Sequence, residues 1–181
     1  MFELQTTVEK SAYFLVSIFN PDYMELEFLS PKDAEGISEY VHKMWVDTYA
    51  PIVPGGRDRA ERIFNEWVGP EKIRKDMENG FFFAYVLQDG ERVGMISAGV
   101  QGRDLEVSKI YIHPDYRHLH IGGEALDYML DYGKDKDCDR AILEVNPRNR
   151  AAISLYESRG FRPIGQNPHD VGYTLLMAAF F

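Results

Sequence analysis

Residues 106–126 read EVSKIYIHPDYRHLHIGGEAL, and this stretch decides the fold of the chain. Its first part is dense in β-branched and aromatic residues and stops at Pro114, which is typical of a strand. After a polar turn, Gly122 and Gly123 open a pattern of apolar residues at helical spacing. These apolar residues are Ala125, Leu126, Met129 and Leu130. The stretch therefore predicts a strand, a turn and a helix in that order.

The turn before this predicted helix has the composition of an anion-binding loop. Glycine has no Cβ, so the backbone there can bring several N–H groups together. These groups, the positive end of the helix dipole and the guanidinium of Arg117 would suit a phosphate group. By itself, however, a glycine-opened helix more often serves turn formation or packing. The predicted pyrophosphate pocket consists of Arg117, His118, Leu119, His120, Ile121, Gly122 and Gly123.

A second strand-to-helix unit follows closely, because residues 141–161 read AILEVNPRNRAAISLYESRGF. The run Ile142–Val145 predicts a buried strand, which breaks at Pro147. Asn149 is the candidate N-cap of the next helix, and Gly160 is its candidate stop in the left-handed conformation.

Together, the two units resemble the GCN5-related N-acetyltransferase (GNAT) family. Its acetyl-CoA loop has the pattern Arg/Gln-x-x-Gly-x-Gly/Ala, and residues 117–122 match it except at His120, which replaces the first glycine. The resemblance extends from residue 24 to about the C-terminus, as one acetyltransferase domain over residues 24–181. A later family segment is matched by Leu143, Glu144, Val145, Asn149, Ala152, Leu155, Tyr156, Gly160 and Phe161.

The resemblance implies an α/β (α+β) fold with a mixed, mostly antiparallel central sheet and helices on both faces. Two parallel central strands, which carry Ile112 and Val145, would splay apart and admit the pantetheine arm of acetyl-CoA. The backbone of Ile110, Tyr111 and Ile112 would bind that arm as a strand-like partner. Asn149 would contact the cofactor beside it.

Tyr156 occupies the family position from which a phenol protonates the departing sulfur, and it would also contact the cofactor. A phenol with a pKa of about 10 stays protonated at neutral pH and roughly matches a thiolate in basicity. Helical spacing alone favours a Tyr156 that packs inward, and only the family resemblance reverses this interpretation.

Glu106 is the candidate general base for the amine. With the period-two alternation of a strand, it would share a face with Ser108, Ile110 and Ile112. Its distance from the strand end would require a relay through water. The alternative is a solvated charge at the start of a strand.

His113, Asp115, His118 and His120 lie within eight residues. They lack the fixed spacing of a preformed ligand set, so we predict no metal site. His120 carries a Cβ where the family prefers glycine, which predicts either a wider loop or a negative φ at this position. When protonated, His120 would add a positive charge beside the pyrophosphate.

Amphipathic helices are predicted before the central strands. Apolar residues recur at helical spacing over residues 31–49, 60–67 and 71–78. Trp45 and Trp67 are expected to anchor the core.

Antiparallel strand pairs are predicted on both sides of the central unit. Residues 81–87 and 92–100 flank Asp89-Gly90, a dipeptide that favours a hairpin turn. Residues 163–165 and 172–177 should form a last pair around a polar bend at residues 166–170.

Residues 1–23 look like an addition to this domain. The segment 12–19, AYFLVSIF, is apolar, but eight residues are too few to span a bilayer. No basic flank precedes the segment as a secretion signal requires. We expect an extra strand or a contact in a homodimer, and no membrane association.

The composition narrows the range of partners. The formal charge of −9 comes from 29 acidic and 20 basic residues, which argues against a nucleic-acid binder and favours a cationic small molecule. Cys138 is the sole cysteine, so an intrachain disulfide is excluded and a reducing compartment, the cytoplasm, is expected.

These observations predict an acetyl-CoA-dependent N-acetyltransferase that acts on an amine. The layout resembles the bacterial spermidine/spermine type, so a polyamine or another small amine is favoured. The resemblance implies that the loop after the first helix borders the acceptor, where Tyr49 would touch it. A protein N-terminus, a lysine or an aminoglycoside remains open as the acceptor. The alternative from another class is a non-catalytic acyl-CoA-binding or regulatory module on the same fold.

Overall fold

The computed structural model describes residues 24–169 and 172–181, so the predicted extension at residues 1–23 lies outside the described residues. Strands in the described part are β1 (Glu25–Phe28), β2 (Phe82–Gln88), β3 (Glu91–Gln101), β4 (Asp104–Ile112), β5 (Arg140–Val145), β6 (Arg162–His169) and β7 (Gly172–Phe180). The α-helices are α1 (Ala34–Tyr49), α2 (Gly56–Val68), α3 (Pro70–Glu78), α4 (Ile121–Asp135) and α5 (Arg150–Ser158). Within these residues, no helix is long and apolar enough to cross a membrane.

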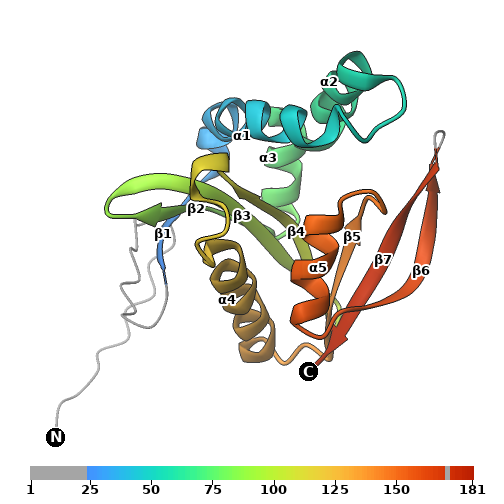
Figure 1. Cartoon of the computed structure of the whole chain (residues 1–181). Helices are drawn as coiled ribbons and strands as arrows, with labels where there is room; N and C mark the ends of the chain where they lie inside the picture. Colours follow the sequence, from blue (N-terminus) through green and yellow to red (C-terminus); the bar gives the residue numbers. More distant parts are fainter. Residues whose placement is uncertain (1–23, 170–171) are drawn as a thin grey trace, which may run out of the picture.

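The strands form one sheet in the order β1-β2-β3-β4-β5-β7-β6. Neighbouring strands are antiparallel except for the central pair β4–β5, which is parallel. Helices α1, α2 and α3 cover one face of this sheet, and α4 and α5 lie on the other (Figure 1). The predicted mixed, mostly antiparallel sheet with helices on both faces is confirmed.

Each face of the sheet has its own apolar core. Leu126 and Met129 of α4 are fully buried against the sheet on one face, and Phe64 of α2 and Ile73 of α3 are buried on the other. Burying each such side chain contributes about 1.5–3 kcal/mol relative to leaving it in water.

The two tryptophans differ in burial. Trp45 lies in the core under α1 with 5 % of its surface exposed, as predicted, but Trp67 is 42 % exposed. The core prediction for Trp67 is therefore wrong. Its ring packs instead on His169 of β6, 5.5 Å between centroids.

The last strand pair is longer than predicted. Residues 166–169 belong to β6 and pair with β7, rather than forming a polar bend. The polar side chains gave a misleading signal, because β6 is the outermost strand and seven of its eight residues are exposed.

Strands β4 and β5 separate soon after they begin. They pair only from Asp104 with Arg140 to Glu106 with Ile142, and the rest of β4 runs without β5 beside it. The predicted splay of the parallel central strands is thus present, and it begins at Glu106.

A β-bulge lies just beyond this point. Lys109 faces Ser97 of β3, whereas Val107 faces Ala98, so Ser108 is an extra residue in β4. Val107 and Ile110, three residues apart, therefore pack in the same core, under α4 and α5.

The bulge overturns the face assignment for Glu106. The prediction that it shares a face with Ile110 and Ile112 is wrong, because one inserted residue reverses the alternation beyond it. Glu106 shares its side of the sheet with Lys109, which faces α3.

Candidate functional site

The loop before α4 keeps a backbone shape that usually requires glycine. His118 and His120 both have φ 66°, in the left-handed region, and His120 is the N-cap of α4. Of the two alternatives predicted for His120, the negative φ is therefore wrong. Among residues with a Cβ, histidine is one of those enriched in this conformation, so the loop shape survives the loss of the glycine.

The start of α4 leaves several backbone donors free. The N–H groups of Gly123 and Glu124 both donate to the carbonyl of His120, at 2.8 and 3.1 Å. Within the described part of the chain, the backbone N–H groups from His118 to Gly122 have no backbone or side-chain acceptor. Residues 118–120 are also exposed, so this helix start can receive an anion.

The apolar members of this segment have different environments. Leu119 is 52 % exposed, whereas Ile121 is buried in the core. A Cβ placed on Gly122 would lie 3.6 Å from Leu155 and 3.7 Å from Ile112, which is ordinary contact. Gly122 therefore lies next to both the end of β4 and α5.

Arg117 connects the loop to α1. Its Nε donates to the carbonyl of Ile112 at 3.1 Å, and its Nη2 donates to Oγ1 of Thr48 at 3.4 Å. The guanidinium thus holds the end of β4 against α1. These two bonds use only two of the five N–H donors of a guanidinium, so the others can contact a phosphate.

The end of β4 turns backbone groups toward the side that β5 has left, although the carbonyl of Ile112 there already accepts from Arg117. The N–H of His113 donates to the carbonyl of Val93, so the alternation of the ladder turns the backbone groups of Ile112 and Ile110 away from β3. Tyr111 lies between them and packs toward α1–α3. The exposed edge can accept a strand-like partner.

A group of tyrosines lies where the separated strands meet α1 and α5. Asn149 caps α5 by accepting from the N–H of Ala152 at 3.3 Å, and its side chain also hydrogen-bonds Tyr49. Burial, and then the neighbouring Tyr49, raise the pKa of Tyr156. Burial likewise holds the pKa of Tyr111 well above its usual value, with Tyr49 and Tyr156 adding to the effect.

This environment defines what Tyr156 can do. The phenol is protonated at neutral pH, but it is a weaker acid than a solvated phenol because its pKa is raised. It can protonate only a strongly basic group, such as a thiolate in the same apolar surroundings. Its ring lies 5.9 Å from that of Phe161, so inward packing and a role at the site are both compatible with its position.

Glu106 faces a charged cluster that the sequence did not suggest. Burial and then Asp76 raise its pKa, while Lys109 and Lys72 act in the opposite direction. Asp76 and Lys109 come from α3 and β4, and each is only 6 % exposed. A lysine and an aspartate 33 residues apart carry no local signal, so only the packing of α3 on β4 brings them together.

Polar residues of β6 and β7 contact Glu144 of β5 on the α1–α3 side of the sheet. Glu144 of β5 accepts from Oγ1 of Thr174 at 2.6 Å and from the side-chain amide of Asn167. Nε2 of His169 lies 3.1 Å from the same Thr174 hydroxyl, and Trp67 packs on that histidine. The β6–β7 hairpin thus links β5 to α2 across the separated strands.

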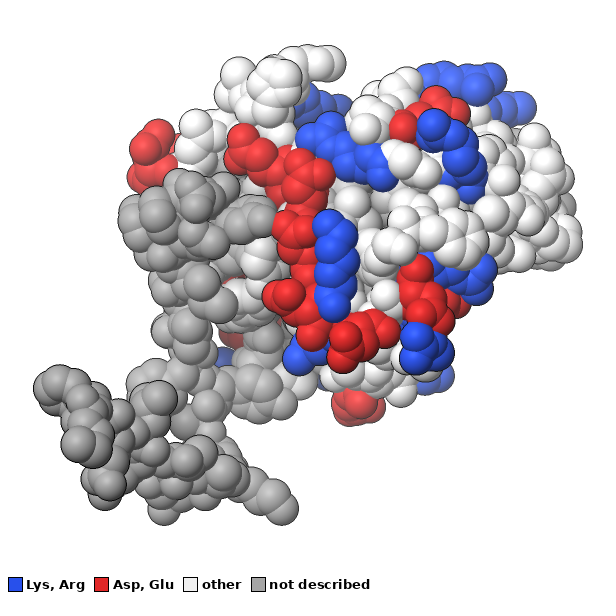
Figure 2. Space-filling view, turned by 90° about the horizontal axis from the view of Figure 1, so that it is seen from below, with Lys and Arg blue, Asp and Glu red and all other residues white. Residues whose placement is uncertain are grey.

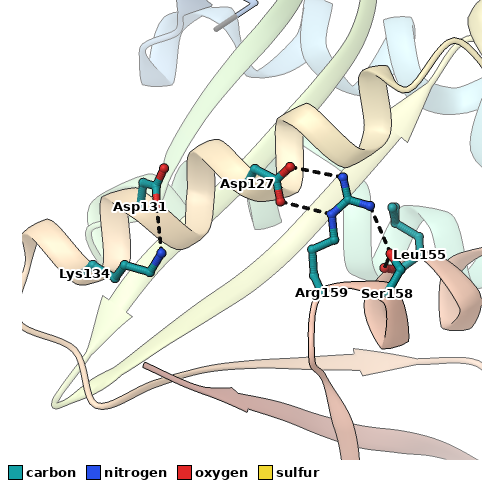
Figure 3. A network of polar contacts seen from close by, with 6 residues as sticks. All are labelled: Asp127, Asp131, Lys134, Leu155, Ser158 and Arg159. Carbon is teal, nitrogen blue, oxygen red and sulfur yellow. Dashed lines mark hydrogen bonds and ion pairs between the residues drawn. The ribbon is translucent and has the colours of Figure 1, made fainter. Parts of the chain in front are cut away.

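A polar network holds α5 against α4 on the other face (Figure 3). Arg159 donates to both carboxylate oxygens of Asp127 at 3.0 and 3.1 Å, and to Oγ of Ser158 at 3.0 Å. A Cβ on Gly123 would lie 2.4 Å from the Arg159 guanidinium, so this glycine lets the arginine cross the first turn of α4. Gly123 therefore has a packing role of its own.

Histidines of the loop do not gather with other ligands. Within residues 24–169 and 172–181, no three His, Cys, Asp or Glu side chains are grouped so that they could hold a metal ion. Nδ1 of His113 instead accepts from the backbone N–H of Asp115 at 3.4 Å.

Comparison with known families gives one match. Residues 39–161 match the model described as the Acetyltransferase (GNAT) family, which is more than half of the chain.

Individual relatives of this chain are also named as N-acetyltransferases. A Spermidine N(1)-acetyltransferase of Thermoplasma acidophilum is 26 % identical over 77 % of this chain and 88 % of its own length. A putative [ribosomal protein bS18]-alanine N-acetyltransferase of Bacillus subtilis is 27 % identical over 59 % of this chain and 71 % of its length. The crystal structure of the PaiA N-acetyltransferase from Thermoplasma acidophilum in complex with coenzyme A superposes with a TM-score of 0.72. That superposition has 23 % identity and covers 87 % of this chain and 99 % of the other.

Proposed function

The chain belongs to the acetyltransferase (GNAT) family and is therefore an acetyl-CoA-dependent acyltransferase; from this premise, we propose that it acetylates a small amine, with a polyamine favoured. The observation that carries the proposal is the separation of β4 and β5 beyond Glu106, at the end of the sheet where α4 and α5 begin. The free amides of α4 and the open edge of β4 lie at this end, and Tyr156, in the last turn of α5, has Tyr49 of α1 and Tyr111 of β4 as neighbours.

Each part of acetyl-CoA has matching residues. The N–H groups from His118 to Gly122 would donate to the diphosphate, and the backbone of Ile110 and Ile112 would hydrogen-bond the pantetheine arm. Asn149, at the start of α5, would contact the arm from the opposite side. Acetyl-CoA supplies the activated acyl group as a thioester.

The side chains divide the proton transfers of acyl transfer between them. In the direct reaction, the amine nitrogen forms a bond to the acyl carbon while the carbon–sulfur bond breaks. Tyr156 would donate a proton to the departing sulfur, and Glu106 would take the proton of the amine through water. The raised pKa of Glu106 makes it a better base than a solvated carboxylate.

The charges on the α1–α3 side favour a cationic acceptor. Glu106, Glu144 and Asp76 contribute three carboxylates, against the two ammonium groups of Lys72 and Lys109. The whole chain carries −9, and acidic side chains also form a band on the face turned away from α1–α3, which Figure 2 shows from below. Such a field attracts polycations. The relative from Thermoplasma is named for spermidine, which agrees with this choice.

A second candidate acceptor is a protein N-terminal amine. Its support is the name of the Bacillus subtilis relative, a putative alanine N-acetyltransferase for a ribosomal protein.

We also propose a cytoplasmic location, supported by the single cysteine of the sequence. The homodimer stays a prediction.

A thiol-release assay with acetyl-CoA tests the acceptor. The panel contains spermidine, a peptide with a free N-terminal alanine, a peptide with an internal lysine, and an aminoglycoside. We expect the largest kcat/KM with spermidine. A larger value with either peptide would replace the polyamine by a protein acceptor, and acetyl-CoA binding without any turnover would favour the non-catalytic module.

A further inference from the structure

The α1–α3 side of the sheet contains an unusual pair of buried charges. Asp76 and Lys109 are the only charged residues of the described ranges that are buried, with 6 % of each exposed. Nζ of Lys109 lies 3.4 Å from Oδ2 of Asp76 and 2.9 Å from Oγ of Ser108. Lys72 pairs with the other carboxylate oxygen of Asp76.

Burying this pair is costly for folding. Removing two charges from water costs several kcal/mol, and their attraction in the interior often returns no more than that. An apolar pair of similar size would be about as stable or more stable. The neighbours of Lys109 include the ring of Phe83, whose centroid is 5.4 Å from Nζ, so the surroundings could accept an apolar side chain.

The bulge at Ser108 places Glu106, the proposed base, on the same side of the sheet as this pair. Without the extra residue, Glu106 and Lys109 would point to opposite faces of β4. With it, Glu106 faces the same charges as the buried pair: Asp76 and Lys72 from α3, Lys109 from β4 and Glu144 from β5. The bulge, the buried pair and the candidate base therefore form one unit.

We propose that Lys109 and Asp76 are a positioning pair that holds Glu106 in the charge state in which it accepts a proton from the amine. This inference rests on the proposed function only for the role of Glu106 as the base. Lys109 stabilises the carboxylate of Glu106, so that it is ionised before the amine arrives. Asp76 opposes this effect and keeps the carboxylate basic enough to take a proton.

The charge that each substitution removes near Glu106 decides the direction in which the kcat–pH profile shifts. Lys109→Met removes a positive neighbour, so the acid limb of the kcat–pH profile should move up by about half to one pH unit. Asp76→Asn removes a negative neighbour of Glu106 and keeps the positive neighbour Lys109. The pKa of Glu106 should therefore fall, and the acid limb of the kcat–pH profile should move to lower pH. A purely structural pair would lower kcat or stability in both variants without shifting the limb in opposite directions.

Two further variants complete the experiment: one is a neutral control, and the other replaces Lys109→Met if that variant does not fold. Ser97 faces Lys109 across β3 and β4, and its buried hydroxyl has no hydrogen-bond partner among the described residues. Ser97→Ala changes a neutral group beside Lys109 and should leave the acid limb in place. Lys72 is 43 % exposed, so Lys72→Gln should fold even if Lys109→Met does not, and should move the limb up by a smaller amount.

A titration that needs no turnover separates the two proposals. The side-chain carboxyl ¹³C signal of Glu106, identified by its loss in Glu106→Gln, is followed against pH by NMR in the wild type and the variants. We expect its midpoint to rise in Lys109→Met or Lys72→Gln and to fall in Asp76→Asn. Unmoved midpoints would overturn the positioning pair whatever the activity. Moved midpoints in a protein that releases no thiol would leave the coupling intact and overturn the proposed function.

Discussion

At the scale of single residues, the most informative departure from the family pattern is His120. It takes a left-handed conformation, which glycine adopts more readily, and an L-residue there costs about 1–2 kcal/mol. The loop therefore keeps its shape at the expense of stability.

Replacing His120 by glycine should stabilise the protein. The gain is about 0.5–1 kcal/mol, because glycine removes the left-handed cost but loses more chain entropy on folding. Urea denaturation measures the difference, with His120→Ala as the control that keeps a Cβ. A loss of stability in His120→Gly would show that the imidazole makes a compensating contact.

Substitutions at Gly122 distinguish an effect on phosphate binding from an effect on the stability of α4. Gly122→Asp places an acidic group in the first turn of α4, where it stabilises the helix by about 0.3–1 kcal/mol. The same charge should repel the diphosphate and raise the KM for acetyl-CoA at least about tenfold. Gly122→Asn, of equal size, should have a much smaller effect on KM. Equal values for the two variants would place the diphosphate elsewhere.

Glu106 predicts a pH-dependent stability. Its pKa in the folded protein is raised, chiefly by burial, so the folded state favours the protonated acid. The stability from this group is complete below its unfolded pKa and is lost as the pH rises through the folded value. Glu106→Gln should therefore be more stable than the wild type at pH 8 and equal to it at pH 4, measured by thermal unfolding. A constant difference at both pH values would contradict the raised pKa.

At the scale of elements, α5 is fixed at its start by one side chain. Asn149 accepts from the N–H of Ala152 and also bonds Tyr49 of α1. Asn149→Ala should cost about 1 kcal/mol in unfolding free energy, while Asn149→Asp keeps the cap. Chemical denaturation compares the two variants, and equal losses would show that the contact with Tyr49, rather than the cap, stabilises this end of α5.

The sequence predicts most elements because their signals are local. Apolar spacing identifies α1 to α4, and Asp89-Gly90 marks the hairpin between β2 and β3. Asn149 and Gly160 mark the ends of α5, where Gly160 has φ 87°.

Long-range features are hidden from the sequence. The bulge at Ser108 depends on the register of β3, and both faces of β4 are partly apolar, so the pattern does not reveal the inserted residue. The Asp76–Lys109 pair and the exposure of Trp67 likewise depend on how α2 and α3 pack against distant strands. Glu106, the proposed base, and its surroundings were therefore the least predictable part of the site.

At the scale of the whole molecule, the sheet separates two kinds of recognition. The α4–α5 side offers backbone amides to an anion, and the α1–α3 side, with the β6–β7 hairpin, offers carboxylates to a cation. The opening between β4 and β5 is where the two meet. In the proposed reaction, this arrangement would bring an anionic acyl donor and a cationic amine together, which is the main requirement of direct acyl transfer.

The most direct test of this account compares thiol release from acetyl-CoA, with spermidine as the acceptor, in the wild type and Tyr156→Phe. Acetyl-CoA binding is measured in both by calorimetry. The account predicts equal binding but a kcat about 10²- to 10⁴-fold lower in Tyr156→Phe, because the variant cannot protonate the sulfur. Unchanged thiol release in Tyr156→Phe would contradict it.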